Sequence, residues 1–119
     1  MKAKLLLSSL CVLLSACASH DPEDGYRGIY TYGQDVSNFR LCNTNQVYWL
    51  RGEPKAMQSI QSEIAMQSAL NDDPYPSIYL HFSGEIDAPP AQGVAADYDG
   101  VIHLEALHIS LMKAPSNCQ

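Results

Sequence analysis

Three histidines in the second half of the chain, together with Glu105, raise the question of metal binding. His103 and Glu105 are two residues apart, so they share one face if this segment is a strand. A break in the pattern after Glu105 would carry His108 to the same face, and His81 lies on the polar face of an earlier strand. Imidazole and carboxylate groups suit copper or zinc. The alternative is that these are ordinary surface histidines, because no compact motif such as His-x-x-x-His is present. The sequence therefore predicts that the protein requires no cofactor. The alternative is that these four residues bind copper or zinc.

Residue patterns typical of catalysis are missing from the sequence. There is no Gly-x-Ser-x-Gly nucleophile motif and no glycine-rich phosphate-binding loop. We therefore expect that the protein is not an enzyme and has no catalytic residues.

The N-terminus carries the clearest chemical signal of the chain. Two lysines precede an apolar run over residues 5–14, and the tetrapeptide Leu-Ser-Ala-Cys follows and ends at Cys17. A basic start, a short apolar run and small residues before a cleavage site describe a secretory signal peptide. A cysteine directly after Leu-Ser-Ala resembles a bacterial lipobox, whose cysteine becomes acylated. The apolar run has about ten residues, whereas a membrane span needs about 20. The pattern predicts that residues 1–16 are removed and that Cys17 carries lipid.

Removal of the leader leaves a small acidic domain beside a membrane. Ala18 and Ser19 follow the cysteine, where lipoproteins of the inner membrane often carry aspartate, so we expect the outer membrane and its periplasmic side. Residues 17–25 then form the lipidated cysteine and a short tether, and residues 26–119 form one domain. Five basic and thirteen acidic residues remain, a net charge near −8. Such a surface repels phosphate backbones, so nucleic acid is excluded as a partner.

Cys42 and Cys118 are the two cysteines that remain after the leader and the lipidated residue are set aside. In an exported and therefore oxidising compartment, an even pair favours a structural disulfide. The alternative is a redox or metal-binding pair of thiols, although no Cys-x-x-Cys spacing is present.

Five short strands and one helix must position these residues. Alternating polar and apolar residues predict strands over 26–32, 39–42, 46–51, 78–87 and 102–111. Pro54 suits the first turn of a helix, and apolar residues at helical spacing extend that helix to residue 70. The alternation slips at Glu105 and Ala106, which indicates a β-bulge. The fold class is therefore mainly β with one helix between the third and fourth strands, the arrangement of a five-stranded OB-type Greek-key barrel.

One stretch of the sequence also resembles a known family. The pattern G-I-Y-x-Y-x-x-D-x-x-x-F-x-x-C-x-T runs from Gly28 to Thr44. It resembles the start of the C-terminal OB-fold domain of NlpE, an outer-membrane lipoprotein linked to copper resistance and envelope stress. The resemblance covers roughly Tyr26 to Cys118 and implies an OB fold, an envelope location and a disulfide between Cys42 and Cys118. The N-terminal NlpE barrel with its Cys-x-x-Cys has no counterpart here, so the resemblance bears less on copper resistance and stress signalling.

Tyr26, Tyr30 and Tyr32 alternate along the first predicted strand and therefore share one face. Exposed, they would form an aromatic surface for a protein partner; the alternative is that they pack against the barrel's outer layer. We expect a non-catalytic envelope lipoprotein, held at the membrane through Cys17, that binds an envelope protein in a structural or stress-related role. The alternative function is a periplasmic copper, zinc or small-ligand binder.

Overall fold

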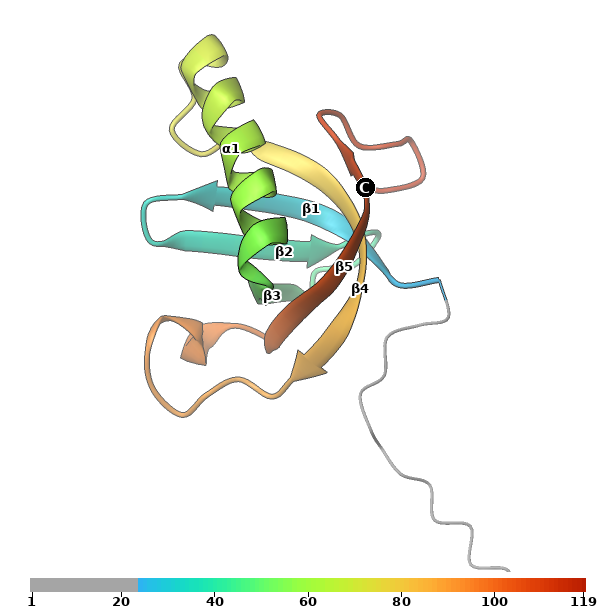
Figure 1. The fold of residues 1–119 in the computed structure, drawn as a ribbon. Helices are drawn as coiled ribbons and strands as arrows, with labels where there is room; N and C mark the ends of the chain where they lie inside the picture. Colours follow the sequence, from blue (N-terminus) through green and yellow to red (C-terminus); the bar gives the residue numbers. More distant parts are fainter. Residues whose placement is uncertain (1–23) are drawn as a thin grey trace, which may run out of the picture.

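A computed structural model describes residues 24–119 of the chain (Figure 1). The predicted signal peptide, the predicted acylation site Cys17 and most of the predicted tether lie outside the described residues. The elements follow the order β1 (Tyr26–Gly33), β2 (Val36–Leu41), β3 (Val47–Gly52), α1 (Pro54–Asn71), β4 (Ser77–Asp87), η1 (Val94–Asp97) and β5 (Val101–Leu111). The prediction of a mainly β protein with one α-helix between its third and fourth strands is confirmed. The short 3-10 helix η1 lies between the last two predicted strands.

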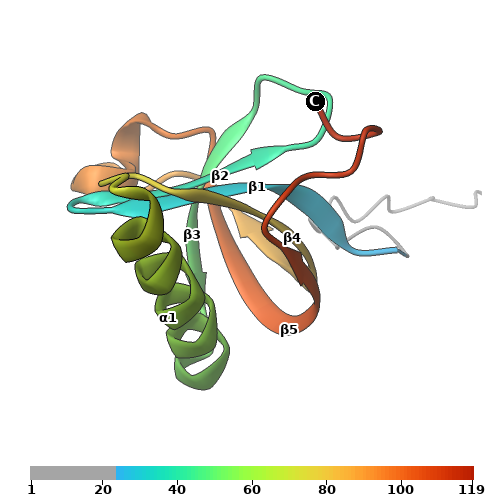
Figure 2. The same ribbon diagram turned by 90° about the horizontal axis from the view of Figure 1, so that it is seen from above.

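The five strands close into a ring in the order β1-β2-β3-β5-β4. All neighbouring strands are antiparallel except β3 and β5, which are parallel. Every described strand therefore has a hydrogen-bonded neighbour on both sides, which protects the sheet from pairing with another chain. The view from above shows α1 lying alongside this ring (Figure 2).

Helix α1 begins and ends at residues suited to those positions. The Glu53 carboxylate accepts a hydrogen bond from the backbone N–H of Ala56 at 3.2 Å, and Pro54 occupies the first turn. At the other end, Asp72 has a φ of 51°, the left-handed conformation that commonly closes a helix. Three apolar residues of α1 are buried against the strands, namely Met57, Ile60 and Ile64.

The core fills the ring interior between the strands and α1. Its fully buried side chains include Phe39, Phe82, Leu80, Ile102 and Leu104. The rings of Phe39 and Phe82 meet edge-on with centroids 4.9 Å apart. Large aromatic side chains of this kind bury the most apolar area per residue, so they dominate the stability of a small core.

The aromatic surface predicted from three tyrosines is wrong, because the face they share points into this core. Tyr30 is fully buried, Tyr26 is 5% exposed, and Tyr32 is partly buried against the same cluster. Alternation identifies residues that share a face of a strand, but it does not identify the face that closure of the ring turns inward.

Strand β2 begins three residues earlier than predicted, because a tight hairpin joins it to β1. Gln34 and Asp35 form a two-residue loop between the paired residues Gly33 and Val36, and Asp35 has a φ of 58°. Positive φ is a feature of such loops. The prediction missed this hairpin because the first residues of β2 include polar ones. Ser37 is nevertheless buried, and its hydroxyl donates to the Leu50 carbonyl at 2.8 Å.

Strand β5 contains the predicted bulge and a second one. Ser83 pairs with Ala106 and Gly84 pairs with Leu104, so Glu105 is the extra residue, as the break in alternation predicted. Three residues later the register slips again, and there the extra residue is His108. Both slips bend the long β4–β5 pair, which helps a five-stranded sheet to close.

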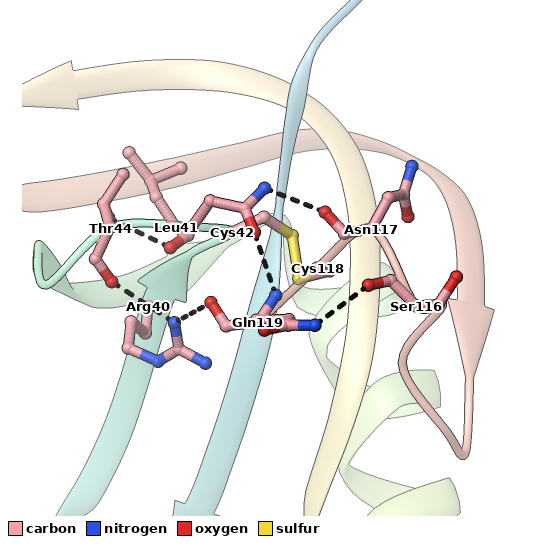
Figure 3. Close-up of a disulfide and its surroundings, with 9 residues drawn as sticks. Arg40, Leu41, Cys42, Thr44, Ser116, Asn117, Cys118 and Gln119 are labelled. Atoms are coloured by element: carbon pink, nitrogen blue, oxygen red, sulfur yellow. Dashed lines mark hydrogen bonds between the residues drawn. A yellow bond between two sulfur atoms is a disulfide. The ribbon is translucent and has the colours of Figure 1, made fainter.

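The predicted disulfide between Cys42 and Cys118 is confirmed, with Cα atoms 4.6 Å apart (Figure 3). Hydrogen bonds reinforce this corner: the Arg40 guanidinium donates to the Gln119 carbonyl at 2.8 Å, and the Asn43 side-chain amide donates to the Asn117 carbonyl at 2.8 Å. The end of the chain is therefore held firmly against the loop that follows β2.

Candidate functional site

Because of the two bulges in β5, the predicted metal-binding residues lie at two separate sites on the β4–β5 pair. His81 on β4 and His108 on β5 lie side by side, with ring centroids 5.2 Å apart and an interplanar angle of 64°. His103 instead pairs with Asp87, with Nε2 and Oδ2 3.3 Å apart. In residues 24–119, no group of three or more histidine, cysteine, aspartate or glutamate side chains could hold a metal ion. The four predicted residues therefore do not converge on one centre.

Each histidine of the close pair has its Nε2 atom engaged. The backbone carbonyl of Asp24 lies within hydrogen-bonding distance of His81 Nε2, and because a carbonyl only accepts, His81 donates through this nitrogen. The Ser83 hydroxyl lies 2.6 Å from His108 Nε2. His81 is half-buried and His108 is exposed, so the pair lies at the surface of the molecule.

The second place is a shallow acidic depression of about 670 Å³ beside His103. Glu105, the fourth predicted metal-binding residue, lines it together with Glu85 and Asp87. The side chains of His103 and Asp87 are 45% and 65% exposed, so water screens their contact and its contribution to stability is small. This arrangement is that of a solvated polar face.

Helix α1 and strand β5 run side by side in the same direction. At the start of the helix, the Glu53 backbone N–H donates to the Leu104 carbonyl at 3.2 Å. Further along, the Ser110 hydroxyl donates to the Glu63 carboxylate at 3.2 Å. The C-terminal half of α1 and the end of β5 therefore lie at the same end of the molecule, the upper end in Figure 1.

Exposed apolar side chains occur at this end of both elements. Met66 follows Glu63 by one helical turn and Leu70 follows Met66 by another, while Met112 comes two residues after Ser110. The three apolar side chains are 64%, 76% and 59% exposed, respectively. We call Met66, Leu70 and Met112 the α1–β5 surface. The sequence indicates the exposure of the two helical residues, since neither Met66 nor Leu70 belongs to the apolar stripe that the helix buries.

The α1–β5 surface has an acidic border. Glu63 belongs to this border, and Asp72 and Asp73 follow directly after the helix that carries Leu70. Lys113 is the basic residue next to Met112. Apolar side chains beside carboxylates offer both hydrophobic contact and attraction to a cation.

Within residues 24–119, no helix combines the length and apolar character required to cross a membrane. Comparison with known proteins finds no family model, no curated protein and no solved structure that matches the chain.

Proposed function

We propose that this protein is a lipid-anchored bacterial envelope protein whose domain binds another envelope protein and catalyses no reaction. The observation that carries the proposal is the exposed α1–β5 surface. Exposed apolar patches with a polar border mark interaction sites, and we propose that Met66, Leu70 and Met112 form such a patch. Methionine suits such a site, because its unbranched side chain adapts to the shape of a partner.

The strand order supports an OB-type Greek-key barrel as the fold. A ring of five strands with β1 paired to β4, β3 parallel to β5 and a helix between β3 and β4 is consistent with this architecture. Together with the resemblance to the C-terminal domain of NlpE, it favours a binding role in the envelope.

The partner that fits the α1–β5 surface is an amphipathic helix with basic residues beside its apolar face. Its apolar side chains would pack on Met66, Leu70 and Met112. Its lysine or arginine side chains would face Glu63 and the Asp72–Asp73 pair. The strongly acidic composition of the chain adds long-range attraction for such a segment.

Metabolic labelling tests the anchor. With a radioactive fatty acid, the wild-type chain should take up label and fractionate with the outer membrane, and Cys17→Ala should do neither. Label that persists in Cys17→Ala, or a wild-type chain that fractionates without membranes, would contradict the lipid-anchor proposal.

Site-specific photo-crosslinking in living cells tests the partner. A photoreactive residue at Met66 or Met112 should capture one discrete envelope protein, and mass spectrometry should locate the crosslink in a basic amphipathic segment. The same residue at Val94, which is as exposed as Met112 at 59%, is the matched control and should capture nothing. Leu70→Asp should abolish capture from Met66, because it places a charge in the apolar contact. Equal capture from Val94, or capture unaffected by Leu70→Asp, would rule out the α1–β5 surface.

A further inference from the structure

We propose that His81 and His108 form a two-imidazole site for a divalent transition-metal ion of the Zn²⁺ or Cu²⁺ class. This inference does not rest on the α1–β5 surface or on a protein partner. It rests on the position, spacing and hydrogen bonds of the two rings.

The second bulge of β5 creates the pair. In an uninterrupted antiparallel ladder, neighbouring residues of a strand point to opposite faces. His81 pairs with Ile109, so His108 would otherwise face away from it. As the extra residue of a bulge, His108 instead joins the face of His81, where their rings are in contact. Bulges commonly re-aim side chains in this way beside functional sites.

The spacing of the rings matches joint binding of one ion. Zinc–nitrogen distances are about 2.0–2.1 Å, which places the centres of two imidazoles on one tetrahedral ion roughly 5 Å apart. The observed separation of the ring centroids is 5.2 Å. Two protein ligands leave the other positions of the ion to water or to a ligand from solution, and imidazole is a preferred donor for zinc and copper.

The hydrogen bonds of the pair orient the rings as in metal sites. A histidine that binds a metal through one nitrogen usually donates its other N–H to a carbonyl, a carboxylate or water. His81 donates through Nε2 to the Asp24 carbonyl, so its Nδ1 atom keeps a free electron pair. When Ser83 accepts from His108 Nε2, the Nδ1 atom of His108 is free in the same way. Each ring then offers one nitrogen to an ion.

Two charged residues beside the pair act in opposite directions. Asp24 is exposed and adjacent, so its carboxylate attracts a cation. Arg27 stands opposite His81 in the β1–β4 ladder, and its guanidinium opposes binding. Arg27→Gln should therefore tighten metal binding, whereas loss of either histidine should weaken it.

Calorimetric titration of the detergent-extracted full chain with Zn²⁺ tests the site. The full chain is needed because a protein beginning at Ala18 would place His20 third from a free amino terminus, a strong copper site of its own. We expect one ion per chain, and affinity at least about tenfold weaker in His81→Ala and in His108→Ala, because each substitution removes one arm of a chelate. His103→Ala and His20→Ala are matched controls and should leave affinity unchanged.

Two further measurements keep the proposal falsifiable. Circular dichroism should show that the histidine variants keep the wild-type melting temperature without metal, and Zn²⁺ should raise it only where both histidines are present. Electron paramagnetic resonance of bound Cu²⁺ should show two coordinating nitrogens in the wild type and one in either variant. No binding by the wild type, or equal binding by His81→Ala, would overturn the proposal and leave the two rings as a packing contact. Loss of binding in His103→Ala would move the site to the acidic depression.

Discussion

At the scale of single residues, one polar pair within the ring limits how the core is packed. The Ser37 hydroxyl donates to the Leu50 carbonyl at 2.8 Å and lies 2.9 Å from the Tyr30 hydroxyl. All three groups are buried, so hydrogen bonds within the protein take the place of water. Ser37 thus connects β1, β2 and β3 inside the ring.

Replacement of this serine should be costly for its size. Ser37→Ala removes the hydrogen bonds that Ser37 makes to the Tyr30 hydroxyl and the Leu50 carbonyl, while Tyr30 keeps its side-chain hydrogen bond with Gln61. We expect the free energy of unfolding to fall by about 1–3 kcal/mol. Urea unfolding measures the change. Ser77→Ala is the control, because its hydroxyl pairs with Thr31 at an exposed position, and it should change stability by less than about 0.5 kcal/mol. Equal effects of the two substitutions would argue against the buried network.

Burial of Tyr30 should also make stability depend on pH in alkaline solution. Burial raises the pKa of the Tyr30 hydroxyl above its usual value, and the hydrogen bond with Ser37 opposes the shift. Because the folded state holds this proton more tightly, the contribution of Tyr30 to stability is constant below the unfolded pKa of about 10 and falls as pH rises beyond it. Urea unfolding between pH 8 and pH 11 should show this decline, and it should be shallower in Tyr30→Phe. A wild-type chain equally stable at pH 8 and pH 11 would contradict the expectation.

At the scale of elements, the β4–β5 pair decides where the chemistry-bearing residues lie. One bulge at Glu105 and another at His108 divide β5 into three short segments, each with its own pairing register against β4. The first leaves His103 beside Asp87, and the second brings His108 to His81. A regular strand would have placed these histidines differently, so the bulges determine both arrangements.

Gly84 tests the first bulge. A Cβ atom on Gly84 would lie 1.9 Å from the His103 carbonyl oxygen, a backbone atom that has no freedom to move aside. Gly84→Ala should therefore destabilise the protein by about 3 kcal/mol or more. Gly93 is the control: its φ is 96° and a Cβ there would meet nothing within 4 Å, so Gly93→Ala should cost only about 1–2 kcal/mol of backbone strain. Thermal melting of both variants measures the difference, and a milder effect at Gly84 than at Gly93 would refute this account of the bulge.

At the scale of the whole molecule, the disulfide joins the end of the chain to the sheet. Cys42 and Cys118 are 76 residues apart in sequence, so the bridge closes most of the domain into one loop. Hydrogen bonds from Arg40 and Asn43 to the last residues run parallel to it. They support the native position of the tail, but they constrain the unfolded chain far less than a covalent bond does.

Reduction should therefore weaken the fold. We expect the free energy of unfolding to fall by about 2–5 kcal/mol in reductant, mainly because the unfolded chain gains freedom. Chemical denaturation with and without reductant measures the loss. A double variant, Cys42→Ser with Cys118→Ser, should be as unstable as the reduced protein and should not respond to reductant. An unchanged denaturation midpoint would show that the bridge is not a stabilising element.

Much of the element structure was predictable because it depends on local patterns. Helical spacing and Pro54 predicted α1 to within one residue of its end, and the slip in alternation located the bulge at Glu105. The hairpin at Gln34 and Asp35 was missed, because Ser37 is polar yet buried and only its partners in the folded ring explain why.

The sequence by itself determined the composition, the spacing of its motifs and the types and approximate bounds of its elements. From these follow the predicted lipobox at Cys17 and the disulfide pairing, since one pair of cysteines remained for the domain. Only the tertiary structure decided which face of β1 is buried and which histidines meet. Side-chain alternation is the same for either face of a strand, and closure of the ring and the second bulge choose between them.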